Sequence, residues 1–463
     1  MGSERLTPLD ASFLYLERPS MHMHVSGLAV FDPSTRADGR LSFRDVEGVI
    51  ASRIHLAPKL RRRVLEVPGH VALPVWADDR NFDLGFHLRH AALPAPGGRA
   101  ELTDFVQRVL SRPLDRSKPL WELYVIEGLE HEHVATIMKV HHAVIDGISG
   151  MQIAMGFYDL TPEPPADRMP PPWTPEEEPT TAELLRAGIE HQLTHPASAL
   201  ADAARSLVRA PGGAALDVSI VASGVRSMLG MGARPRSPFD TTIGPNRRFA
   251  ITDAPLQMYK DVKNALGGTV NDVVLTVVAG GIHRLLRDRR VPTKGVTLRV
   301  MVPVSVRTEN ERGGNRVAPA FVDVPVGAMS PKRRLAIVRE STATLKESMM
   351  AMSADAIIGL GAYAPGGMLA AAARAASRGP WFNLVVSNIP GPQVPLYLAG
   401  ARLVANYPSM PLGRNSALSI ACTSLGGTMA FGLTADWDAL PDVDALAIAM
   451  EDSLAELAKS AGL

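Results

Sequence analysis

Apolar residues recur along the first third of the chain with the spacings of alternating helices and strands. Apolar positions three and four residues apart predict helices over residues 42–54 and 100–110. Two extended runs, residues 120–127 and 133–140, are rich in β-branched residues and predict strands. Because helices and strands are interleaved, we expect residues 1–160 to form an α/β domain.

The last part of the chain shows the same mixture of elements without an exact sequence repeat. The predicted elements are helices over residues 269–288 and 443–457 and strands over 297–306, 381–387, 417–423 and 428–434. Gly426-Gly427, between the last two strands, predicts a hairpin. The stretch Asn388-Ile389-Pro390-Gly391-Pro392 predicts a tight turn. Residues 248–463 are therefore expected to form a second α/β domain of similar build.

The segment between these regions, residues 161–247, has a different composition. Its many prolines, including the run 170–172, are typical of a linker. Residues 184–210 are rich in alanine and amphipathic, and Pro196 should kink or divide them. The pattern predicts a helix that either crosses between the domains or lies against a membrane. The membrane alternative rests on the polar side, which carries Arg186, Arg205 and Arg209.

Composition excludes several classes of protein. The chain has 463 residues, with 48 Lys+Arg against 47 Asp+Glu, a balance that disfavours nucleic acid as a partner. Its single cysteine, Cys422, cannot form an intrachain disulfide, so we expect a cytoplasmic protein. We expect neither a signal peptide nor a membrane-spanning helix, because no run of about 18 apolar residues occurs. The mean hydropathy of +0.05 nevertheless predicts a large core, an apolar ligand tunnel or a surface that contacts lipid.

The strongest chemical signal is His141-His142-Ala143-Val144-Ile145-Asp146-Gly147, which follows a predicted strand. Histidine suits a general base because its ordinary pKa near 6.5 leaves it mostly neutral at pH 7. We expect no metal, since adjacent strand residues point to opposite faces and no further ligand cluster is evident. The alternative is a histidine that only packs in the core. Asp146 is placed to pin the local backbone or to pair with an arginine, and Gly147 permits the turn.

Further short motifs occur along nearly the whole chain. They are Pro8-Leu9-Asp10, Met23-His24-Val25, Pro119-Leu120-Trp121-Glu122, Pro171-Pro172-Trp173, Thr269-Val270-Asn271-Asp272, Pro303-Val304-Ser305-Val306-Arg307 and Asn388-Ile389-Pro390-Gly391-Pro392. With the HHxxxDG core, these motifs resemble the bacterial wax ester synthase/diacylglycerol acyltransferase family. The core alone recurs in the wider superfamily of chloramphenicol acetyltransferase-like enzymes, so the flanking motifs make the resemblance specific.

The resemblance implies two chloramphenicol acetyltransferase-like domains that form a pseudodimer with a tunnel through their interface. It implies that His142 removes the proton of an acceptor hydroxyl, which attacks the thioester of a fatty acyl-CoA directly. The implied acceptors are diacylglycerol, giving triacylglycerol, and long-chain alcohols, giving wax esters, and no bound cofactor is implied. The residues agree, since the chain has no GxSxG nucleophile elbow and Cys422 is expected to be a buried structural thiol.

The oxyanion of such a reaction needs hydrogen-bond donors. Asn388 is the first candidate, because an amide on a tight turn can aim at a fixed point; the alternative is an Asx turn that serves only the backbone. Asn271 is favoured as a helix N-cap, although the resemblance marks Asn271-Asp272 as relevant to activity. Arg307 is expected to pair with Asp146, the alternative being a solvated strand end.

Two other functions remain as alternatives. One is a condensation-like enzyme that uses carrier-bound thioesters, and the other is a non-catalytic protein that binds lipid inclusions. Because acyl-CoA and diacylglycerol partition into lipid, we expect peripheral attachment to a lipid inclusion or the inner membrane surface. The expected docking segments are residues 184–209 and 357–376. The near-neutral charge predicts that attachment responds weakly to salt.

Overall fold

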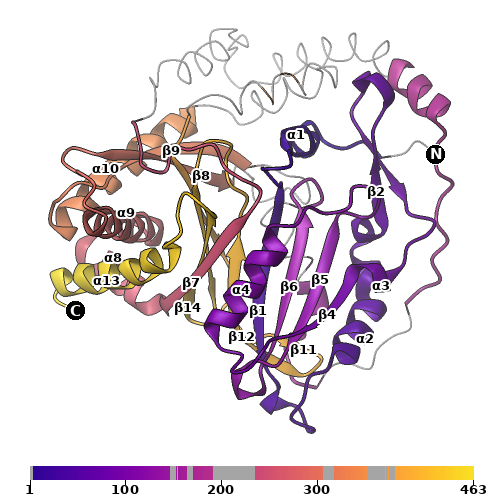
Figure 1. Ribbon diagram of the computed structural model, residues 1–463, viewed down its shortest axis with the longest axis horizontal. Helices are drawn as coiled ribbons and strands as arrows, with labels where there is room; N and C mark the ends of the chain where they lie inside the picture. The colour runs from indigo at the N-terminus through magenta and orange to yellow at the C-terminus, as the bar shows by residue number, and fades with distance from the viewer. Residues whose placement is uncertain are drawn as a thin grey trace.

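Two six-stranded sheets flanked by helices make up the protein (Figure 1). The computed structural model describes residues 4–145, 153, 155–163, 170–190, 235–305, 317–351, 371, 374 and 381–463. In Figure 1 the first sheet lies on the right and the second on the left, side by side. This confirms the mixed α/β architecture that the alternating patterns predict.

The first sheet has the strand order β11-β12-β1-β6-β5-β4. Its strands are β1 (His24–Asp32), β4 (Leu88–Ala92), β5 (Trp121–Glu127), β6 (Val134–His141), β11 (Tyr397–Leu398) and β12 (Ala401–Ser409). The helices of this half are α1 (Pro8–Leu16), α2 (Phe43–Arg53), α3 (Leu84–His87) and α4 (Arg99–Leu110), and β2 (Arg62–Leu65) pairs with β3 (Val75–Asp78). Strand β12 comes from late in the chain, yet it pairs antiparallel with β1. The first sheet is therefore completed by residues 397–409.

The second sheet has the order β7-β14-β13-β10-β8-β9. Its strands are β7 (Arg247–Pro255), β8 (Thr297–Ser305), β9 (Val317–Pro325), β10 (Leu384–Pro390), β13 (Leu418–Leu425) and β14 (Thr428–Asp436). Its helices are α8 (Leu256–Leu266), α9 (Val270–Asp288), α10 (Pro331–Ala351) and α13 (Val443–Ala461), which lie on its outer side in Figure 1. The predicted hairpin at Gly426-Gly427 is confirmed, because it joins β13 and β14 and both glycines have positive φ.

The predicted turn at Asn388 is wrong. Strand β10 continues through Pro390 in parallel register with β13, and Asn388 lies opposite Cys422. The Thr423 hydroxyl also donates a hydrogen bond of 2.7 Å to the carbonyl of Ile389. Pairing with a distant strand thus outweighs the local preference of Asn and Pro for a turn.

The two sheets share apolar packing where they meet. One buried cluster combines Leu28 and Ile137 of the first sheet with Phe249 and Ile251 of β7, next to α4. At Gly432 of β14, a Cβ atom would lie 1.9 Å from the carbonyl oxygen of Pro408 on β12. Only glycine permits so close an approach of two backbones.

Helix α9 is buried along most of its length. Among the described residues, no single helix combines the length and apolar composition needed to cross a membrane. The bent pair of α8 and α9, which meet at 101°, reaches that length and composition only when both are counted together.

Candidate active site

The His-His turn begins where β6 ends, between the two strands that flank it. The His141 N–H donates to the carbonyl of Leu120, and the His142 N–H donates 2.8 Å to the carbonyl of Met23. These two hydrogen bonds connect the first residues of the turn to the segments that precede β5 and β1. The backbone that bears both imidazoles is therefore fixed relative to the sheet. Asp146 and Gly147, predicted to complete this site, lie outside the described residues.

Protein groups lie beside both ring nitrogens of His141. Its side chain is fully buried, and Nδ1 accepts the Ala143 N–H at 3.0 Å. A neutral ring that accepts at Nδ1 carries its proton on Nε2. That atom lies 3.6 Å from Oε1 of Glu17, longer than a hydrogen bond but within ion-pair range. These contacts fix the orientation of the His141 ring.

Glu17, just beyond the end of α1, lies between His141 and Met23. Its Oε1 accepts the N–H of Met23 at 3.3 Å, and Met23 in turn accepts from His142. Burial alone would raise the pKa of Glu17, but His141, the Met23 N–H and Arg116 together hold the pKa below its ordinary value. The sequence interpretation missed Glu17. The only local signal was an acid shortly before Met23-His24-Val25.

His142 is the first residue of the turn after β6. It is half-buried, and its ring stacks on Phe13 of α1, with centroids 4.0 Å apart and planes inclined by 16°. Among the described residues, no group of three or more His, Cys, Asp and Glu side chains could hold a metal.

An apolar cluster adjoins His142. Phe13 and Leu16 of α1 pack against buried Met21 and Met23, and the cluster also contains Ile243 and Leu412 from the second half of the chain. Phe13 and Met23 are also the residues that contact His142. The accessible histidine therefore stands in an apolar environment built by both halves, as an apolar substrate requires.

Buried Lys and His side chains connect the strands before this turn to the C-terminal end of α4. The last carbonyls of a helix lack donors from the helix itself. At the end of α4, Lys139 Nζ donates to the carbonyls of Val109 and Arg112 at 3.3 and 3.0 Å. Nε2 of His24 donates to the carbonyl of Leu110, and Nε2 of His22 donates to the carbonyl of Ser111, each at 3.1 Å. Cations and N–H donors suit the negative end of a helix, so the end of α4 is tied to β6 and β1.

Lys139 is fully buried, and its charge is balanced by Glu122 of the Pro119-Leu120-Trp121-Glu122 motif. The Nζ atom lies 3.2 Å from Glu122 Oε2, to which the Tyr124 hydroxyl also donates. Burial lowers the pKa of Lys139, whereas Glu122 acts in the opposite direction. This motif therefore supports β6 two residues before His141.

Trp121 anchors the same motif in the core. Its indole N–H donates 2.7 Å to the carbonyl of Leu60, and its ring stacks on His87 at 4.5 Å. The side chain is buried in the cluster behind β5 and β6. A large aromatic whose polar atom is satisfied fixes the packing of both strands.

The predicted oxyanion donors are not joined to His142 by any contact among the described residues. Asn388 is half-buried on β10, and strand alternation places it on the same face as Leu384 and Val386, which pack with α9. Its role as a donor stays a prediction. Arg307, expected to pair with Asp146, lies outside the described residues.

The prediction that Asn271 caps α9 is wrong. Thr269 is the N-cap, because its hydroxyl accepts the Asp272 N–H and Oδ2 of Asp272 accepts the Thr269 N–H at 2.7 Å. Oδ1 of Asp272 accepts from the Thr342 hydroxyl of α10. Asp272 therefore stabilises the helix start, and half-buried Asn271 is left as the residue of this motif that could face a ligand.

Cys422 is fully buried within β13, and burial raises the pKa of its thiol. A thiolate is the nucleophilic form of cysteine, so this environment opposes its formation. The prediction of a structural thiol is confirmed.

Comparison with known proteins matches two family models to the chain. The wax ester synthase/diacylglycerol acyltransferase catalytic domain matches residues 6–274, and the WS/DGAT C-terminal domain matches residues 313–458. Two Mycobacterium tuberculosis proteins named as diacylglycerol O-acyltransferases, Rv1760 and Rv3740c, are each 32% identical to it. The alignments cover 98% of this chain and 90% of the first relative, and 99% of this chain and 100% of the second.

Solved structures share the fold. The wax ester synthase/diacylglycerol acyltransferase of Marinobacter aquaeolei is 28% identical, with a TM-score of 0.68 over 99% of this chain and 100% of that chain. A mutant starter condensation domain of rhizomide synthetase, in complex with C8-CoA, has a TM-score of 0.57 at 14% identity, covering 100% of this chain and 95% of that chain. The second likeness concerns the fold alone.

Proposed function

This chain belongs to the wax ester synthase/diacylglycerol acyltransferase family, and from that premise we propose that it transfers a fatty acyl group from acyl-CoA to diacylglycerol. The product is triacylglycerol, and a long-chain alcohol in place of diacylglycerol gives a wax ester. The observation that carries this proposal is the half-buried His142 beside an apolar cluster to which both halves of the chain contribute.

We infer the following step from that geometry. His142 accepts the proton of the acceptor hydroxyl while the hydroxyl oxygen attacks the thioester carbonyl carbon. The new C–O bond forms, the C–S bond breaks, and the departing CoA sulfur takes the proton back from the imidazolium. No acyl-enzyme is needed, in agreement with the buried state of Cys422. We propose in addition that the substrates reach His142 through a tunnel between the two halves of the chain, and that nearby N–H donors stabilise the oxyanion.

A product screen tests the acceptor and donor classes. We expect purified protein with oleoyl-CoA to form triacylglycerol from diolein and wax ester from hexadecanol, both visible by thin-layer chromatography. Omitting the acceptor is the control for thioester hydrolysis. Transfer from carrier-bound acyl groups but not from oleoyl-CoA would point instead to a condensation-like enzyme, and lipid binding without any product would point to the non-catalytic alternative.

We also propose that the protein works in the cytoplasm, attached peripherally to a lipid inclusion or the inner membrane surface. In the described part of residues 184–209, Leu184 is buried whereas Ile189 is 51% exposed. The remainder of that segment, and nearly all of residues 357–376, lie outside the described residues. Exposed apolar side chains beside basic ones favour an interface with lipid.

Flotation with liposomes tests this attachment. We expect the protein to float with phosphatidylcholine liposomes and to do so nearly as well in high salt, because apolar contact is not screened. Deletion of residues 184–209 or of 357–376 should reduce the floating fraction. Full recovery of both deletion variants with the liposomes would contradict these two docking segments.

A further inference from the structure

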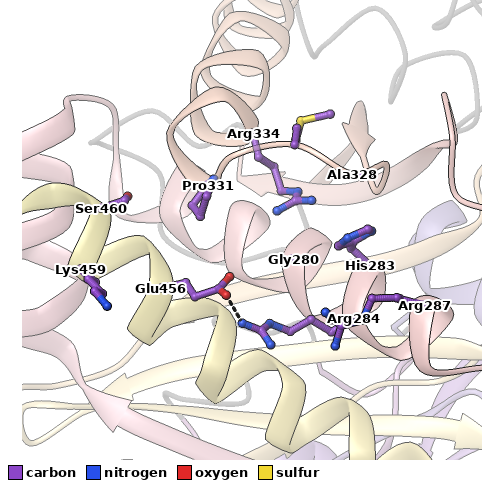
Figure 2. Close-up of a pocket in the computed structure, with 11 residues that line it drawn as sticks. Gly280, His283, Arg284, Arg287, Ala328, Pro331, Arg334, Glu456, Lys459 and Ser460 are labelled. Carbon is purple, nitrogen blue, oxygen red and sulfur yellow. Dashed lines mark ion pairs between the residues drawn. The ribbon is translucent and has the colours of Figure 1, made fainter.

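A surface pocket of about 530 Å³ lies in the outer helical layer of the second sheet (Figure 2). Its walls come from α9, from the residues that lead into α10, from the start of α10, and from the last turns of α13. None of its lining residues belongs to the His142 site. The pocket therefore needs an explanation other than the acyl transfer proposed above.

The charge of the lining is strongly unbalanced. Among the lining residues, the basic side chains are Arg284, Arg287, Arg334 and Lys459, and the single carboxylate is Glu456. That carboxylate is already engaged, since Glu456 Oε1 lies 2.5 Å from Arg284 Nη2. Outside the lining, Asp288 pairs with Arg287 and Asp452 with Arg284. Positive charge still exceeds negative charge among these groups, which attracts an anion.

Arg334 is the most unusual member of the lining. It is 5% exposed, and its guanidinium points into the pocket in Figure 2. Nε and Nη2 donate to the carbonyls of Pro325 and Gly327 at 3.2 and 2.8 Å. No carboxylate lies within ion-pair distance of it among the described residues, and burial lowers its pKa. The nearby charge of Glu456 acts in the opposite direction, but that carboxylate is shared with Arg284 and makes no direct ion pair with Arg334, so an anionic ligand would stabilise this buried cation.

The position of Arg334 within its helix adds a second argument. Cations near the C-terminal ends of helices, such as Arg287 of α9 and Lys459 of α13, are favoured by the helix dipole and need no ligand. Arg334 instead lies in the first turn of α10, where the dipole disfavours a cation and where no acidic residue occurs. The start of a helix and a basic side chain together form an anion site.

We propose that this pocket binds a phosphate group, carried either by a lipid headgroup or by free phosphate. Arg334 would contact it from the buried wall, and Arg287 and Lys459 from the rim. A planar guanidinium with free N–H groups matches the oxygens of a phosphate.

Thermal unfolding at constant ionic strength tests the proposal. Replacing chloride with inorganic phosphate should raise the Tm of the full chain by about 2 °C or more at saturation. The rim variant Arg287→Gln/Lys459→Gln should lose this increase, whereas the matched variant Lys260→Gln/Lys294→Gln, at exposed sites outside the pocket, should keep it. Phosphate also stabilises proteins by exclusion from their surface. Equal Tm increases in the two variants would therefore overturn a specific phosphate site.

Vesicle binding separates the two sources of phosphate. We compare phosphatidylcholine vesicles with and without phosphatidic acid, using the same two variants. Stronger binding of wild type and of the matched variant to vesicles with phosphatidic acid, lost in the rim variant, assigns a headgroup. A phosphate-dependent Tm increase without this preference assigns free phosphate. Neither effect in wild type would overturn the proposal. Because Arg334→Gln could unfold the protein, the test uses the rim variant Arg287→Gln/Lys459→Gln instead.

Discussion

Replacing His142 with alanine should lower kcat for acyl transfer by about 10²–10⁴-fold, the usual contribution of a general base. The His142 imidazole is the accessible one of the pair, whereas His141 is buried, accepts a hydrogen bond at Nδ1 and has Nε2 3.6 Å from Glu17. Loss of the His142 side chain removes the proton acceptor but leaves the N–H bond to Met23 intact. Triacylglycerol formed from oleoyl-CoA and diolein gives the rate, and circular dichroism confirms the fold.

His90→Ala is the matched control. This histidine lies on the edge strand β4, half exposed and paired with Glu127, so its loss should leave kcat nearly unchanged. In wild type, activity should also fall as pH decreases through the range of about 5–8 in which an unperturbed histidine titrates. Retained synthesis in His142→Ala, or a flat pH profile over that range, would exclude His142 as the base.

Replacing Lys139 with methionine should lower the free energy of unfolding by about 3–5 kcal/mol, the cost of removing one partner of a buried ion pair. The change removes the nearer of the two cations beside Glu122, since Arg89 lies 3.8 Å away, and it removes the side-chain donor to the carbonyls of Val109 and Arg112. Because these bonds tie α4 to β6, kcat should fall as well. Urea denaturation measures the stability, and Lys260→Met on the exposed side of α8 is the control.

The double variant Lys139→Met/Glu122→Gln distinguishes the ion pair from simple loss of packing. Removing both charges leaves neither one buried alone, so the double variant should be less destabilised than the sum of the two single variants. Additive effects, or a Lys139→Met variant as stable as the control, would show that this pair does not brace the site.

Regular elements were predictable from the sequence because their signals are local. The apolar spacing of residues 269–288 predicted α9, and Gly426-Gly427 predicted the hairpin between β13 and β14. The turn at Asn388 was wrong because the partner that extends β10 lies more than 30 residues away in β13. The prediction that Asn271 caps α9 was wrong although the correct signal is local, since Thr269 and Asp272 have the spacing of a capping box.

The sequence by itself determined the family, because its short motifs occur in the order typical of that family. It also singled out His142 as the candidate base. Only the tertiary structure decided what surrounds that histidine. Phe13, Glu17 and Met23 meet the turn after β6 from more than 100 residues away, and Leu412 reaches the apolar cluster from the other half of the chain. Such contacts depend on which strands pair and how the two sheets pack, and no local spacing encodes those long-range choices.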